Sequence, residues 1–75
     1  MQSEVIRDFG TSMTVRINGE PFYLSGLKSR EIIVSKNGEF MGSFMKKSGK
    51  ERPMLGSPRA ATAVHTAATW WKLYR

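Results

Sequence analysis

The chain of 75 residues contains no cysteine and a single histidine, His65. Without cysteine, neither a disulfide nor a thiolate metal site can stabilise the fold, and a zinc site would need carboxylates, which are scattered along the sequence. We therefore expect no metal and no cofactor. A chain this short buries only about 60% of the surface that it exposes when unfolded. A second copy would add burial, which favours a homodimer over a monomer.

Long hydrophobic runs are also missing. The first ten residues, MQSEVIRDFG, are charged and contain no apolar run of about 7–15 residues, so they are not expected to be a signal peptide. The longest uncharged segment near the C-terminus, residues 60–71, is too short to cross a bilayer. Because the lack of cysteine is compatible with a reducing compartment, we expect a cytoplasmic protein with no membrane contact.

Acidic residues are scarce in the last part of the chain. Residues 1–45 carry five basic and five acidic residues, whereas residues 46–75 carry seven basic residues and one acid, Glu51. The whole net charge of +6 therefore lies in the second segment. This asymmetry indicates an anionic partner; the other interpretation is a basic surface that keeps the protein in solution.

Groups that could carry out catalysis are few. The segment GSFMKKSGKE does not fit the phosphate-binding Walker pattern, because six residues separate Gly42 from Gly49 and Glu51 follows Lys50. His65 falls on the polar half of the expected C-terminal helix, where a solvated side chain is the simpler interpretation. We therefore expect a non-enzymatic protein with no catalytic residue.

Two Asn-Gly pairs, at residues 18–19 and 37–38, organise the first two-thirds of the chain. Asn-Gly suits the two-residue type I′ hairpin turn, which sets the register of both flanking strands. In the first hairpin this register pairs Val15 with Phe22. Pro21 lacks an amide donor, so the strand at residues 20–24 is expected at a sheet edge or with few hydrogen bonds there.

The second Asn-Gly turn pairs Ser35 with Phe40 and Val34 with Met41, which leaves apolar residues on both faces of this hairpin. One face then carries Ile33, Phe40, Gly42, Phe44 and Lys46, and the other carries Ile32, Val34, Met41 and Met45. One face can cover the core. The other must meet the helix, a partner chain or a ligand.

The predicted fold is α+β. A four- or five-stranded antiparallel sheet of two Asn-Gly hairpins spans about residues 4–46, with residues 4–9 as an optional first strand. A basic loop follows at residues 47–56, anchored by Met54 and Leu55. One amphipathic helix, at about residues 58–73, packs on the sheet; Ser57 caps it and Pro58 opens it. All of this forms one small domain, residues 1–75.

Nucleic acid is the first expected partner, with weak sequence preference, and DNA or RNA, single strand or duplex, stay open. Lys and Arg contribute most of such affinity through phosphates, and exposed rings add stacking on single strands. The expected phosphate contacts are Lys46, Lys47, Lys50, Arg52 and Arg59, with Lys28 and Arg30 flanking them. Phe40 and Phe44 are stacking candidates if exposed; the competing interpretation places both rings under the helix.

A protein-interaction or inhibitor module is the alternative function. A small cysteine-free domain with an apolar hairpin face could dock on a larger protein or nucleoprotein complex, and methionines suit adaptable contacts. Met13, Met41, Met45 and Met54 are the residues concerned; the alternative is that they fill the core. Such a build suits an accessory factor encoded by a phage or mobile element.

One loose resemblance points in the same direction. A sheet followed by a helix that opens at Leu55-Gly56-Ser57-Pro58, together with the segment IRDFG at residues 6–10, resembles the positive-cofactor type of coactivator domain. The resemblance implies a dimer that binds single-stranded DNA. The Ala/Thr-rich helix ending in Trp-Trp departs from that family's pattern, and no functional residue is carried over.

Overall fold

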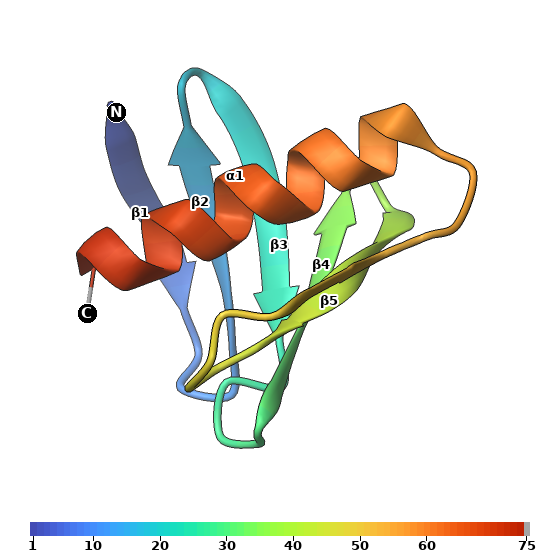
Figure 1. The fold of residues 1–75 in the computed structure, drawn as a ribbon. Helices are drawn as coiled ribbons and strands as arrows, with labels where there is room; N and C mark the ends of the chain where they lie inside the picture. Colours follow the sequence, from blue (N-terminus) through green and yellow to red (C-terminus); the bar gives the residue numbers. More distant parts are fainter. Residues whose placement is uncertain (75) are drawn as a thin grey trace.

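The computed structural model describes residues 1–74, which form an α+β fold with a six-stranded antiparallel open sheet and one C-terminal helix (Figure 1). The strands lie in the sheet in their order along the chain. They are β1 (Ser3–Asp8), β2 (Ser12–Ile17), β3 (Glu20–Ser25), β4 (Glu31–Lys36), β5 (Glu39–Met45) and β6 (Glu51–Pro53), followed by α1 (Pro58–Tyr74). The predicted four or five strands are corrected to six, because residues 51–53 of the expected basic loop pair with β5 as β6.

Both Asn-Gly pairs form the expected turns. Asn18 and Asn37 have φ of 52°, and the glycines that follow them have φ of 82° and 77°. This is the positive-φ pair that a type I′ turn needs. The predicted register of the first hairpin is confirmed, since Val15 pairs with Phe22 and Ile17 with Glu20.

The predicted register of the second hairpin is wrong beyond Phe40, because β5 contains a bulge. Ser35 pairs with Phe40 as expected, but Val34 pairs with Gly42 and not with Met41. One extra residue moves every later side chain of a strand to the opposite face. Here it allows Met41 and Phe44, three positions apart, both to be buried, at 2% and 1% exposure.

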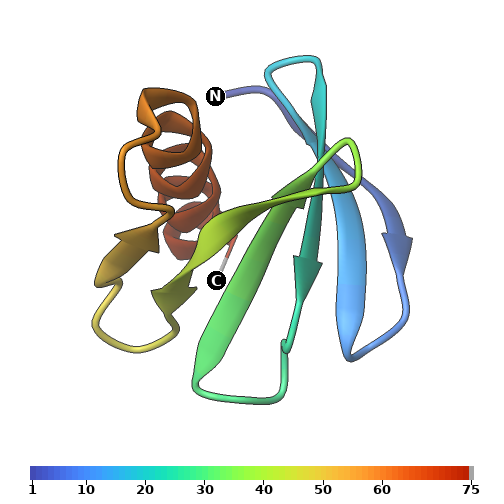
Figure 2. The same cartoon turned by 90° about the vertical axis from the view of Figure 1, so that its right-hand side faces the viewer.

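The helix covers one side of the sheet, and its length agrees with the predicted 58–73. Figure 2 shows α1 on one side of the strands and none of the chain on the other side, which we call the open face. The Ala60 amide donates to Ser57 Oγ at 3.1 Å, which confirms the N-cap. Trp70 and Trp71 are buried, and the ring centre of Trp71 lies 6.4 Å from that of Phe44.

Two local expectations have different outcomes. Pro21 lies in an inner strand, but β3 pairs with β4 only from Tyr23 onward, so Pro21 makes few ladder bonds, as one prediction had it. Met54 and Leu55 are exposed, Leu55 by 99%, so they do not anchor the basic segment. The ladder between β5 and β6 holds this segment instead.

Within the described residues, no helix has the length and apolar character needed to span a membrane.

Candidate nucleic-acid interface

The order of the strands gathers three connections at one end of the sheet. Successive connections of an antiparallel meander alternate between its two ends, so the segments joining β1 to β2, β3 to β4 and β5 to β6 share an end, opposite both Asn-Gly turns (Figure 1). Lys28 and Arg30 follow β3, and Lys46 and Lys47 follow β5. The Lys46 amide donates to the Arg30 carbonyl at 2.8 Å, which joins the two segments directly.

A buried side chain and an internal hydrogen bond hold the connection between β3 and β4 in place. Leu27 is buried in the core at 9% exposure. The Ser29 hydroxyl donates to the Gly26 carbonyl at 2.8 Å, and Gly26 has the positive φ, 73°, that this tight path requires. These contacts fix the backbone of the connection, and the side chains of Lys28 and Arg30 on it are exposed to solvent.

Lys46 is half-buried and has a structural role as well as a charge. Its ammonium group donates to the Leu27 carbonyl, and Nζ lies 6.0 Å from the ring centre of Trp71. Both contacts stabilise a cation, the second through the negative face of the ring. Lys46 therefore fastens the end of β5 to the preceding connection and to the helix.

The turn after β5 brings a further cation from the helix into the group. Gly49 has φ of 76°, and its amide donates to the Met45 carbonyl at 2.8 Å. A Cβ atom at Gly49 would lie 3.1 Å from Lys72 Cε, so the Lys72 side chain lies over this turn. Sequence reasoning missed Lys72, because only the packing of α1 brings it beside Gly49, which lies 23 residues earlier in the chain.

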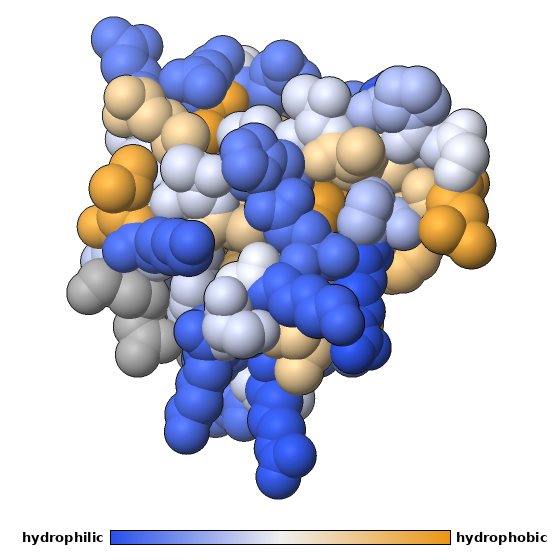
Figure 3. All heavy atoms as spheres, in the orientation of Figure 1, coloured by the Kyte–Doolittle hydropathy of each residue, from blue (hydrophilic) through white to orange (hydrophobic). Residues whose placement is uncertain are grey.

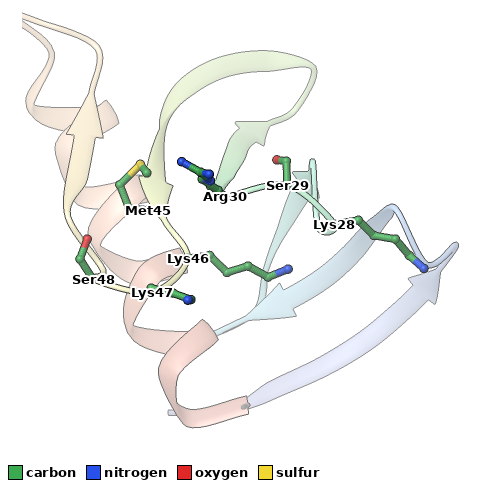
Figure 4. Close-up of a pocket in the computed structure, with 7 residues that line it drawn as sticks. All are labelled: Lys28, Ser29, Arg30, Met45, Lys46, Lys47 and Ser48. Atoms are coloured by element: carbon green, nitrogen blue, oxygen red, sulfur yellow. The ribbon is translucent and has the colours of Figure 1, made fainter.

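Two adjoining hollows lie at this end of the molecule. The first, about 560 Å³, is lined by Lys28, Ser29, Arg30, Met45, Lys46, Lys47 and Ser48 (Figure 4). The second, about 420 Å³, is lined by Lys46, Lys47, Trp71 and Lys72. We call the cations of both hollows the basic end: Lys28, Arg30, Lys46, Lys47 and Lys72.

Among residues 1–74, no carboxylate lines either hollow and no cation of the basic end forms an ion pair. Asp8, at the end of β1 on the same end of the sheet, accepts the Gly10 amide at 2.8 Å and lines neither hollow. Figure 3 shows long hydrophilic side chains extending from the lower end of the molecule, where Figure 1 places these connections. The basic end therefore presents concentrated positive charge in a concave surface, which attracts anions.

The other predicted phosphate contacts lie elsewhere. Lys50 is exposed at the end of the same turn but lines neither hollow. Arg52 lies 4.0 Å from a Glu31 oxygen, and Arg59, at the start of α1, lies 2.8 Å from a Glu39 oxygen at the opposite end of the sheet. The seven predicted cations thus do not form one continuous surface.

The predicted pair of stacking rings does not exist. Phe44 is 1% exposed beneath α1, whereas Phe40 is 51% exposed on the open face, because the bulge at Met41 separates their faces. The two rings are therefore neither both exposed for stacking nor both covered by the helix. Phe40 shares the open face with Tyr23 and Ile33, which are 43% and 40% exposed. The alternation of the first hairpin already placed Tyr23 outward, but nothing in the sequence paired it with Phe40.

The remaining titratable groups form pairs and no larger cluster among the described residues. Within residues 1–74, no three His, Asp or Glu side chains are grouped closely enough to hold a metal ion. His65 is exposed, as expected, with Nδ1 2.8 Å from Glu51 Oε2. At the opposite end, the hydrogen bond and charge of Lys36 lower the pKa of the Glu20 carboxyl.

Comparison with known proteins gives no match: no family model, no curated protein and no solved structure is significantly similar to this chain. The functional argument therefore depends on the residues and their geometry.

Proposed function

We propose that the protein is a small non-enzymatic nucleic-acid-binding protein whose basic end contacts the phosphate backbone. The observation that supports this most is the convergence of five cations from three separate segments around two hollows that no carboxylate of the described residues lines. Phosphates along a strand offer a matching row of charges, and their neutralisation releases counterions. Contacts with phosphates carry no sequence information, so we propose weak sequence preference.

Lys46 has a different part in this proposal from its neighbours. Its ammonium group is already bonded to the Leu27 carbonyl, so it positions the turn and adds to the local potential. The exposed side chains of Lys28, Arg30 and Lys47 are the direct phosphate contacts, and Lys72 extends the surface toward the helix.

The test is fluorescence anisotropy with labelled single-stranded DNA, duplex DNA and RNA at 50 and 200 mM salt. If Lys28, Arg30, Lys47 and Lys72 neutralise about four phosphates, affinity should fall roughly 50- to 150-fold across this range, from slopes of about −2.8 for single strands to about −3.6 for duplex. Absence of binding to every probe at 50 mM salt would contradict the proposal.

A matched pair of variants locates the contact. Lys47→Glu should weaken binding by at least tenfold at 50 mM salt, because it adds a negative charge inside the hollow. Arg59→Glu changes the net charge equally, but at the opposite end of the sheet, and should have a much smaller effect. Equal losses from both variants would indicate a response to net charge and no defined contact surface.

A protein-interaction module is the second candidate function, and the apolar part of the open face favours it. Tyr23, Ile33 and Phe40 are each at least 40% exposed there. Of the four methionines considered from the sequence, Met13 and Met41 are buried in the core, whereas Met54 is 45% exposed and Met45 is half-buried, so only two of them are open to a partner. Capture of a specific protein by a wild-type chain that binds no nucleic acid would favour it.

A further inference from the structure

We infer that the nucleic acid is single-stranded and that two of its bases stack on Tyr23 and Phe40 of the open face. This inference rests on the proposed function and adds the class of nucleic acid to it.

The two rings lie in one row across the sheet. Tyr23 pairs with Ser35, and Ser35 pairs with Phe40, so the rings project from strands on either side of a small residue. Neighbouring strands lie about 4.8 Å apart, which places the two ring attachments roughly 10 Å from each other. Serine does not fill the space between the rings, and their faces stay accessible at 43% and 51% exposure.

The row is continuous with the basic end along β4. On the open face, Ser35 is followed by Ile33 and Glu31, and Arg30 comes next at the basic end. Five residues of strand span roughly 16 Å, a distance that a strand of a few nucleotides can bridge. A single strand gripped by its phosphates at the basic end can therefore lay its next bases over the rings.

The polar residues of the open face favour a nucleic acid over a protein partner. Ser25 and Ser43 flank Ile33 and Ser35 separates the two rings, so each row of the open face across these three strands contains serine as well as apolar or aromatic side chains. Each of the two carboxylates of this face has an arginine near it: Glu4 lies 3.2 Å from Arg16, and Glu31, which accepts the Ser43 hydroxyl, lies 4.0 Å from Arg52. The surface is thus free of uncompensated negative charge, which a polyanion requires.

Stacking also selects the form of the nucleic acid. A base in a duplex is paired and stacked on its neighbours, so its flat face is not available to a side chain. An unpaired base can lie on an aromatic ring, and alanine substitution of such rings lowers affinity about 5- to 150-fold per base. Every base has such a face, which agrees with weak sequence preference.

The experiment compares the double variant Tyr23→Ala/Phe40→Ala with the wild type. The probes are a labelled single strand of twelve thymidine nucleotides and a labelled twelve-base-pair duplex, both at 50 mM salt. Single-strand affinity should fall at least tenfold, duplex affinity should change less than twofold, and the salt slope should stay the same. Tyr23→Phe/Phe40→Tyr keeps both rings and should retain single-strand affinity. Leu55→Ala removes a more exposed apolar side chain outside the open face and should have no effect.

The outcomes separate the inference from the proposed function. If the double alanine variant keeps its affinity while Lys47→Glu loses it, the phosphate contact stands and the stacking inference is overturned. Equal loss for single strand and duplex would overturn the inference as well. If the wild type binds no nucleic acid, the proposed function itself fails.

Discussion

Replacing Gly42 with alanine should destabilise the protein by about 2–5 kcal/mol, because three elements meet at this glycine. A Cβ atom here would lie 2.5 Å from the Arg52 carbonyl oxygen, 2.7 Å from Pro53 Cα and 2.9 Å from Val64 Cγ2. The first two are backbone atoms of β6, which cannot rotate away. Overpacking of this kind costs about 1–3 kcal/mol.

The backbone conformation adds a second penalty. Gly42 has φ of 143°, a conformation that residues with a side chain rarely adopt, at a cost of about 1–3 kcal/mol. Alanine recovers about 0.4–1 kcal/mol by restricting the unfolded chain. A domain of this length has a free energy of unfolding of about 4–11 kcal/mol, so the loss is a large fraction of the total.

Urea unfolding followed by tryptophan fluorescence measures this change, since Trp70 and Trp71 are buried and become exposed. Gly38→Ala is the matched control: Gly38 has φ of 77° but no atom within 4 Å of a Cβ position, so it carries only the backbone penalty. If Gly42→Ala unfolds at the same urea concentration as Gly38→Ala, the close approach of β6 and α1 is refuted.

Three further predictions concern the core, the helix cap and an ion pair. Phe44→Ala should lower the free energy of unfolding by about 3–5 kcal/mol, and Phe40→Ala by less than 1, in the same urea assay; equal losses would contradict their assignment to opposite faces. Ser57→Ala should lower the thermal midpoint, corresponding to about 1 kcal/mol for a lost N-cap, whereas an unchanged midpoint would mean that the cap is not formed. The Glu20 carboxyl should titrate below its ordinary pKa of 4.5 by NMR and return toward it in Lys36→Met. Because the folded-state pKa is the lower one, this pair contributes stability above about pH 4.5 that is lost as pH falls; a Glu20 pKa unchanged by Lys36→Met would contradict the pairing.

Local chemistry made the hairpins and the helix predictable. The positive φ that Asn-Gly accepts, the alternation around Val15 and Phe22, and the Ser57-Pro58 step each depend on a few adjacent residues. The bulge at Met41 is different in kind. It places both Met41 and Phe44 in the core, and no pattern of adjacent residues signals it.

The candidate site was predictable to the same extent. Because Lys28 and Arg30 lie at the far end of the hairpin that leads to Lys46, register alone placed these cations near each other. Lys72 could not be found in this way, since its position over Gly49 follows from helix packing. The pairing of Tyr23 with Phe40 across Ser35 also required the register between the two hairpins, which no turn motif determines.

The order of the strands has a consequence for how the chain folds. Each strand pairs with the one synthesised just before it, so the sheet can grow hairpin by hairpin through short loop closures. Low contact order of this kind favours rapid folding. Only α1, the last element, must return across β5, β4 and β2 to make distant contacts. Among the described elements, the long-range closure thus belongs to α1, and the apolar side of the sheet is covered only when this helix packs on it.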